Sequence, residues 1–133
     1  MSLAVVDASA LVAFYAADDP RRAMITARLA AGDTLFAPAH LDTEIVSALR
    51  GLSRPSPRLQ AAVPRALGHL AAFPIRRMPL APLLQRIWEL RDNLTAYDAA
   101  YVALAERLNG PLITCDGKFS GASGPRCTFD LIT

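Results

Sequence analysis

Four acidic residues stand where an α/β chain places groups that bind ligands. Asp7 and Asp116 each directly follow a short apolar run that is typical of a buried strand. Glu44 and Asp98 lie near the starts of two expected helices. In a parallel sheet, the carboxyl ends of the strands and the N-termini of the helices that follow them share one edge, where ligands bind. We therefore expect these four carboxylates to converge on one site.

Carboxylates gathered without cations repel one another and raise each other's pKa. A cluster of four carries about −4, which two Mg²⁺ ions would balance, and such hard cations prefer oxygen ligands. Two ions can clamp a phosphodiester, one activating the attacking water and the other stabilising the leaving oxygen. The two histidines, His40 and His69, have no paired ligands at metal spacing. The acids therefore indicate metal-dependent phosphoryl chemistry.

Each acid also has an ordinary structural explanation. Asp7 could begin a turn, and Asp116 with the glycine after it could be another. Thr95 and Asp98 have the spacing of a capping box, and Glu44 could simply favour the dipole of its helix. Asp98 is the least ordinary of the four, because it lies in a mostly apolar segment. The hypothesis of a metal site depends on the joint pattern.

The elements that must position these acids alternate between strands and helices. Expected strands cover 3–6, 35–37, 73–80 as a possible edge strand, 112–115 and 126–131. Expected helices cover 10–17, 20–31 with Asp19-Pro20 at its start, 41–50, 57–70, 80–92 and 95–108, and Pro64 predicts a kink or two short helices. This alternation predicts an α/β fold with a mostly parallel sheet.

Composition places the chain among single globular domains. It has 133 residues, of which 53% are hydrophobic and 20% charged, and we expect one domain over 1–133 with a substantial core. No apolar run approaches the roughly 20 residues that span a bilayer, and no basic segment precedes the first apolar run. Two cysteines do not make a disulfide framework. These features predict a cytoplasmic protein with no membrane partner.

The basic residues are unevenly distributed. Thirteen of the fourteen are arginine, and eight of those arginines lie in 50–91 against the single acid Glu89. Arginine suits phosphate recognition, although a solvated helix face would look the same. We name as candidate RNA contacts Arg50, Arg54, Arg76 and Arg77.

Four segments resemble the motifs of PIN-domain nucleases. Val5–Leu11 resembles the opening motif, Thr43–Arg50 the second acidic motif and Leu94–Ala105 the third, which is the most specific. Leu112–Asp116, a strand that ends in Thr-x-Asp, resembles the fourth. All four occur in order over essentially the whole chain, and the compact size is similar to that of the VapC toxins of bacterial toxin–antitoxin pairs.

This resemblance implies a three-layer α/β/α domain with a roughly five-stranded sheet and the activity of a metal-dependent endoribonuclease. It implies that Mg²⁺ or Mn²⁺ is held by the matching acids, that a metal-activated water attacks the RNA phosphodiester in line, and that small hydroxyl residues orient ligands or waters. The matching acids are Asp7, Glu44, Asp98 and Asp116, and the matching hydroxyl residues are Ser9 and Thr114. The resemblance also implies a homodimer and inhibition by a cognate small VapB-type antitoxin. One departure is that the glycine-rich tail after Asp116 carries no second aspartate nearby.

Two other functions fit parts of the pattern. Phosphotransfer through an aspartyl intermediate would use an aspartate after the first strand, a later aspartate and the lone Lys118. Its usual Asp-x-Asp or tandem acids are, however, absent at Asp7-Ala8-Ser9. A binding module that recognises RNA or a partner without catalysis would keep the fold, and the loss of an acid would have favoured it. All four acids are present, so the nuclease is the leading hypothesis.

Overall fold

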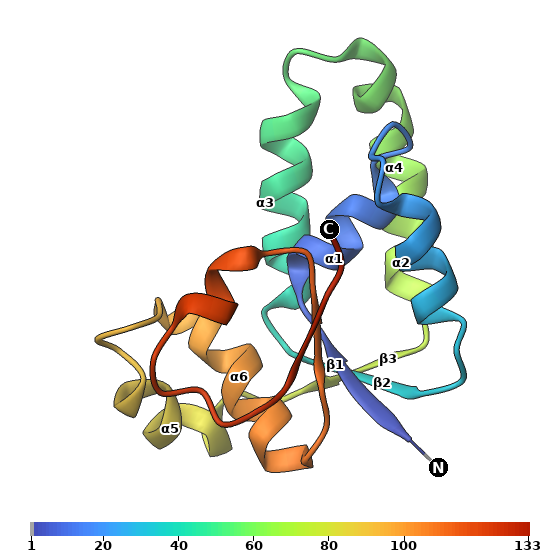
Figure 1. Ribbon diagram of the computed structural model, residues 1–133. Coiled ribbons are helices and arrows are strands. Elements are labelled where there is room, and N and C mark those ends of the chain that lie inside the picture. The colour runs from blue at the N-terminus through green and yellow to red at the C-terminus, as the bar shows by residue number, and fades with distance from the viewer. Residues whose placement is uncertain (1) are drawn as a thin grey trace.

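The computed structural model describes residues 2–133 and contains a single five-stranded sheet (Figure 1). Every neighbouring pair of strands is parallel, and the strand order is β3-β2-β1-β4-β5. The strands are β1 (Leu3–Val6), β2 (Thr34–Pro38), β3 (Ile75–Met78), β4 (Leu112–Thr114) and β5 (Phe129–Leu131). The predicted α/β class and parallel sheet are confirmed.

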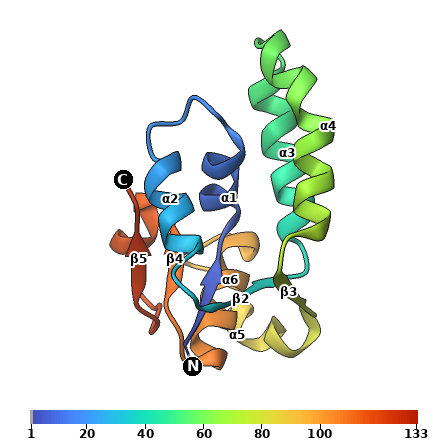
Figure 2. The same ribbon diagram turned by 90° about the vertical axis from the view of Figure 1, so that its right-hand side faces the viewer.

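Six α-helices and two short 3-10 helices connect these strands within the described residues. The helices are α1 (Ala8–Tyr15), α2 (Arg22–Leu29), α3 (Leu41–Ser53), α4 (Pro57–Ala72), α5 (Leu84–Glu89) and α6 (Ala96–Leu108), with η1 (Ala81–Leu83) and η2 (Gly117–Gly121). Helix α6 packs on β1, β2 and β4, whereas α1 and α2 lie on the other side of the sheet (Figure 1). Helices α3 and α4 pair with each other and extend away from the sheet (Figure 2).

The strand order creates a switch point beside β1. The chain leaves β1 toward β2 and β3 on one side, then returns through α5 and α6 to β4 on the other side. Right-handed crossovers in opposite directions place their helices on opposite faces of the sheet. The carboxyl ends of β1 and β4 therefore border the crevice where open parallel sheets bind their ligands.

The core explains the near-continuous apolar runs in the sequence. Residues Ala4–Val6 of β1 and Leu112–Thr114 of β4 are buried, as expected for parallel strands covered on both faces. Residues Ala99–Ala105 of α6 are buried without a break, because α6 lies between the sheet and α5. Small residues dominate this stretch, so α6 can approach the sheet closely. This packing brings the first turn of α6 to the switch point.

Several helix boundaries differ from the sequence-based prediction. Helix α2 begins at Arg22 and not at the Asp19-Pro20 pair, because the Asp19 carboxylate accepts hydrogen bonds from the backbone and guanidinium of Arg21. Helix α3 continues to Ser53, three residues beyond the predicted end at residue 50. Helix α4 is one helix that contains Pro64, not two short ones, and the Ser56 hydroxyl caps its start by accepting a hydrogen bond from the Leu59 amide.

Two strand predictions also have clear outcomes. The predicted edge strand within 73–80 is β3 at the edge of the sheet, and the strand predicted over 126–131 is limited to Phe129–Leu131. Across residues 2–133, no helix combines the length and the hydropathy needed to cross a bilayer.

Candidate active site

Asp7 is a buried carboxylate at the end of β1, with a side chain only 3% exposed. It caps α1 by accepting a hydrogen bond from the Ala10 amide at 3.1 Å. The Ser9 hydroxyl donates to its Oδ1 at 2.7 Å and the Thr114 hydroxyl donates to its Oδ2 at 2.5 Å. Burial raises the pKa of Asp7 to about 6, and the nearby Asp116 adds to the rise, although these hydrogen bonds oppose it. A cation beside Asp7 would relieve this penalty.

Ser9 and Thr114 connect the two strand ends that border the crevice. Besides donating to Asp7, the Thr114 hydroxyl accepts from the Asp116 amide at 2.9 Å. The Ser9 hydroxyl accepts from the Cys115 amide at 3.0 Å and lies 3.3 Å from the Thr114 hydroxyl. Both hydroxyls are thus used to hold Asp7 and the chain after β4 in place. Their expected role in orienting ligands or waters stays a prediction.

Glu44 approaches the crevice from the first turns of α3. Its Oε1 accepts a hydrogen bond from the Tyr101 hydroxyl at 2.5 Å and lies 3.2 Å from His40 Nε2. Burial raises the pKa of Glu44, but the hydrogen bonds from His40 and Tyr101 outweigh it, so the pKa lies below its ordinary value. His40 Nε2 also contacts the Tyr97 carbonyl at 3.0 Å, and two acceptors require that this nitrogen carries a proton.

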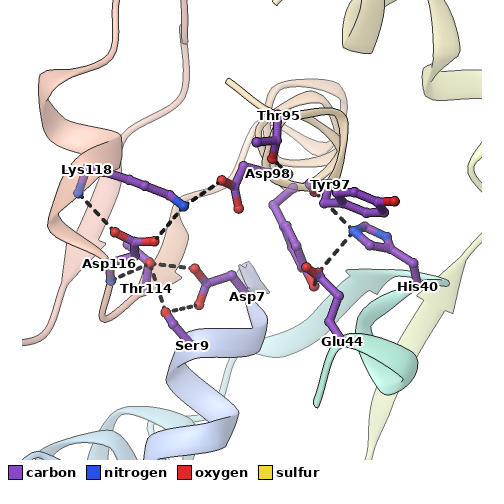
Figure 3. Close-up of polar contacts among 11 residues, drawn as sticks. Asp7, Ser9, His40, Glu44, Thr95, Tyr97, Asp98, Thr114, Asp116 and Lys118 are labelled. Carbon is purple, nitrogen blue, oxygen red and sulfur yellow. Dashed lines mark hydrogen bonds and ion pairs between the residues drawn. The ribbon is translucent and has the colours of Figure 1, made fainter. Parts of the chain in front are cut away.

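Asp98 and Asp116 share one ammonium group. Lys118 Nζ lies 2.9 Å from Asp98 Oδ2 and 3.2 Å from Asp116 Oδ2 (Figure 3). The Asp98 amide donates to the Thr95 hydroxyl, which caps α6 as the capping-box spacing predicts. The Asp98 carboxylate itself is directed at Lys118. The predicted cap by Thr95 is confirmed, whereas the metal-binding role of Asp98 stays a prediction.

The four predicted acids surround one region of the crevice, but they do not form a ready-made ion cage (Figure 3). Among residues 2–133, no three acidic, histidine or cysteine side chains stand close enough to hold one ion as they lie. Each acid is instead held by its neighbours. The hydroxyls of Ser9 and Thr114 bind Asp7, and the side chains of His40 and Tyr101 bind Glu44. Lys118 pairs with both Asp98 and Asp116.

Sequence reasoning missed His40 and Tyr101 as residues of this site, and it considered Lys118 only for the phosphotransfer alternative. His40 is four residues before Glu44, which is the spacing of neighbours on one face of a helix. Tyr101 is three residues after Asp98, so the two side chains lie on the same face of α6. Lys118 follows Asp116 by two residues. These spacings were visible, but the contacts depend on how α3, α6 and η2 pack.

The four candidate RNA-binding arginines divide into two groups. Arg50, Arg54 and Arg76 are exposed, and the Arg76 guanidinium lies 5.8 Å from the ring centroid of Phe36. Arg77 has a different role from the one predicted, because its guanidinium makes five hydrogen bonds within the domain. The acceptors are the two carboxylate oxygens of Asp42 and the carbonyls of Leu70, Phe73 and Ile75. All five N–H groups are used, so none is left for a phosphate.

A groove of about 570 Å³ opens beside Glu44, between the start of α3 and the start of α6. Its lining includes His40, Thr43, Ser47 and Tyr97. The Tyr97 side chain is 65% exposed and its ring lies 6.2 Å from that of His40, centroid to centroid. Glu44 therefore borders an open groove that contains an accessible aromatic ring.

Comparison with known proteins identifies the class of this fold and site. A family profile described as "PIN domain" matches residues 4–124. Ribonuclease VapC12 of Mycobacterium tuberculosis is 38% identical over 137 residues, which cover 96% of this chain and 98% of the relative. The chain therefore belongs to the PIN-domain family, among the VapC ribonucleases.

Solved structures agree on the fold at lower sequence identity. The crystal structure of Mycobacterium tuberculosis VapC20, described as a Sarcin-Ricin loop cleaving toxin, matches with a TM-score of 0.68 at 22% identity over 89% of this chain and 93% of that chain. A chain of VapBC2 from Rickettsia felis, solved with a promoter DNA fragment, matches with a TM-score of 0.65 at 13% identity over 98% of this chain and 99% of that chain. The family predicted from the four motifs is confirmed.

Proposed function

We propose that this protein is a metal-dependent endoribonuclease and the toxin of a toxin–antitoxin pair. One observation carries the proposal: the acids after β1 and β4 and at the starts of α3 and α6 all face the switch point of the sheet. The names of the relatives, ribonucleases of the VapC type, support the same activity.

The donor set fits Mg²⁺ or Mn²⁺. All four acids offer hard carboxylate oxygens, Asp7 carries a buried charge that lacks a cation, and an ammonium stands in for one between Asp98 and Asp116. We propose that Asp7, Glu44, Asp98 and Asp116 hold the metal. When bound, the metal would activate a water and stabilise charge on the phosphodiester.

The neighbouring residues fix the carboxylates for this task. Ser9 and Thr114 each bind one oxygen of Asp7, so its carboxylate plane cannot rotate freely. His40 and Tyr101 both bind Oε1 of Glu44, which leaves Oε2 as the oxygen to which neither donates. Such supporting hydrogen bonds orient metal-binding groups in many proteins.

RNA and an antitoxin are the proposed partners. Three exposed arginines can meet the RNA backbone, which makes binding sensitive to salt: Arg50 on α3, Arg54 directly after α3, and Arg76 on β3. A cognate VapB-type antitoxin could place an arginine among the acids, because a guanidinium replaces a metal electrostatically. We also propose that the protein acts as a homodimer.

The decisive experiment is cleavage of a mixed cellular RNA pool with Mg²⁺ or Mn²⁺, beside an EDTA control and Asp98→Asn. This variant keeps the backbone amide of residue 98, which donates to the Thr95 hydroxyl, and loses only the partly exposed ion pair with Lys118. Its free energy of unfolding should therefore change by less than about 1 kcal/mol. We expect discrete fragments that vanish in EDTA and with Asp98→Asn. The exposed Asp92 offers a matched control, since Asp92→Asn should cleave normally.

Inactivity of the folded, antitoxin-free protein in both metals would favour a non-catalytic RNA- or partner-binding module. Phosphotransfer through Asp7 is disfavoured because neither Asp-x-Asp nor tandem acids occur at Asp7-Ala8-Ser9. Radioactive phosphate that stays covalently bound to the protein after denaturation would support phosphotransfer instead.

A further inference from the structure

Lys118 occupies the space between two of the acids proposed to hold metal. Its Nζ lies within 3.2 Å of one oxygen from Asp98 and one from Asp116. The two carboxylates come from different parts of the fold, the first turn of α6 and the end of β4. An ammonium that contacts both neutralises repulsion between them without any added ion.

The fold holds Lys118 close to this position. The Asp116 carboxylate caps η2 by accepting a hydrogen bond from the Lys118 amide at 3.1 Å, so one aspartate fixes the backbone of the residue whose side chain it also binds. The side chain is 58% exposed, whereas that of Asp98 is 18% exposed. Lys118 is therefore tethered at the mouth of the site and has open space into which it can move.

The choice of residue type is informative. Lys118 is the only lysine in a chain with thirteen arginines. A lysine ammonium is a compact charge on a flexible stem, whereas a guanidinium is a planar fork that fits two carboxylate oxygens of one group. A compact, mobile ammonium therefore replaces a small metal ion between two carboxylates better than a guanidinium would.

From these observations we propose that Lys118 is a resident counter-ion that competes with divalent metal for Asp98 and Asp116. This inference rests on the proposed function, because it treats the acids as the metal site. Two positive groups cannot occupy the same space between the carboxylates, so a metal ion that enters must displace the ammonium. Lys118 thereby weakens metal binding and keeps the metal-free site intact.

The test is a titration of the metal-free protein with Mn²⁺, followed by calorimetry and by the electron paramagnetic resonance signal of free Mn²⁺, without RNA. Lys118 Nζ lies 2.9 Å from an oxygen of Asp98 and 3.2 Å from an oxygen of Asp116, and a metal ion that displaces it must break both contacts. Losing one contact between unit charges at about 3 Å weakens metal binding by about tenfold, even at the dielectric constant of water. We therefore expect Lys118→Gln to bind Mn²⁺ at least about tenfold more tightly than the wild type. Lys118→Arg keeps the charge, so it should gain much less affinity than Lys118→Gln.

Three results would overturn the inference. Lys118→Gln could bind Mn²⁺ no more tightly than the wild type, Lys118→Arg could gain as much affinity as Lys118→Gln, or none of the proteins could bind Mn²⁺. Because the titration contains no RNA, its result is separate from the cleavage assay. Metal-dependent cleavage with an unchanged titration would refute the role of Lys118 alone, whereas the expected titration without cleavage would refute the nuclease alone.

Discussion

Neutralising the most buried acid of the site should make the metal-free protein more stable. Asp7 is 3% exposed, and burial raises its pKa from 3.8 to about 6. The folded protein therefore binds this proton more tightly than the unfolded chain does. Below about pH 4 both states are protonated and the carboxylate costs nothing. The cost grows as the pH rises toward 6 and is constant above it.

The pKa shift gives the size of the effect. A rise from 3.8 to about 6 corresponds to a cost of up to about 3 kcal/mol in the free energy of unfolding above pH 6. Asp7→Asn removes the charge and keeps one oxygen, which can still accept from Ser9 and Ala10. Its NH₂ group faces the Thr114 hydroxyl, which must turn, at a cost of about 1 kcal/mol. We expect a net gain of about 2 kcal/mol for Asp7→Asn.

Urea denaturation in EDTA at pH 4, 5.5 and 7.5 measures this gain. The difference between Asp7→Asn and the wild type should be near zero or negative at pH 4 and should rise to its full value by pH 7.5. Comparing the two proteins at each pH cancels the titration of the other acids. Asp92→Asn, at an exposed position, should show no such rise.

A destabilised Asp7→Asn at pH 7.5 in EDTA would refute this reasoning. It would mean that the hydrogen bonds from Ser9 and Thr114 outweigh the burial of the charge. A gain that is already complete at pH 4 would refute it as well, because the cause would then lie outside the titration of Asp7. Saturating Mn²⁺ should stabilise the wild type and not the variant.

Other substitutions separate residues that support the fold from residues that meet RNA. Tyr101→Phe keeps a buried ring and removes the hydrogen bond to Glu44, so urea denaturation at pH 7.5 should show a loss of about 2 kcal/mol. Arg77→Met removes five hydrogen bonds, so thermal denaturation should show a loss of more than about 2 kcal/mol while cleavage per folded molecule is unchanged. Arg50→Gln and Arg54→Gln should leave stability within about 0.5 kcal/mol and each lower the salt dependence of RNA binding by about one phosphate contact; an unchanged salt slope would remove them from the RNA surface.

Strand ends could be located from the sequence because they depend on local signals. Asp7 and Asp116 each end an apolar run, and parallel strands bring such ends to one edge whatever the details of packing. Asp98 could be placed because Thr95 marks the start of its helix. The convergence of these acids at one edge of the sheet could therefore be predicted from the alternation of strands and helices along the chain.

The partners of these acids could not be predicted, because they depend on contacts distant in sequence. Glu44 and Tyr101 are 57 positions apart and meet only because α6 packs across β1 and β2 near the start of α3. Arg77 looked like part of a basic surface, yet its position beside Asp42 and the end of α4 directs it inward. Residue type and spacing do not determine such long-range pairs.

The structural and functional explanations of the acids are not alternatives, and their opposite effects on stability follow from how each charge is held. Asp7 is a buried charge that lacks a cation, whereas Glu44 is held by His40 and Tyr101, which lower its pKa despite its burial. A lowered pKa contributes stability that is present above the unfolded value of 4.5 and is lost as the pH falls through the folded value.

Glu44→Gln should therefore destabilise the metal-free protein at pH 7.5, by less as the pH falls, where Asp7→Asn stabilises it. Both variants should lose cleavage, since each removes a proposed metal ligand. Denaturation curves in EDTA that shift in the same direction for both variants would show that burial, and not the donors around each carboxylate, controls its contribution. Opposite shifts would mean that the site holds Glu44 in its charged form without metal and leaves Asp7 dependent on a cation.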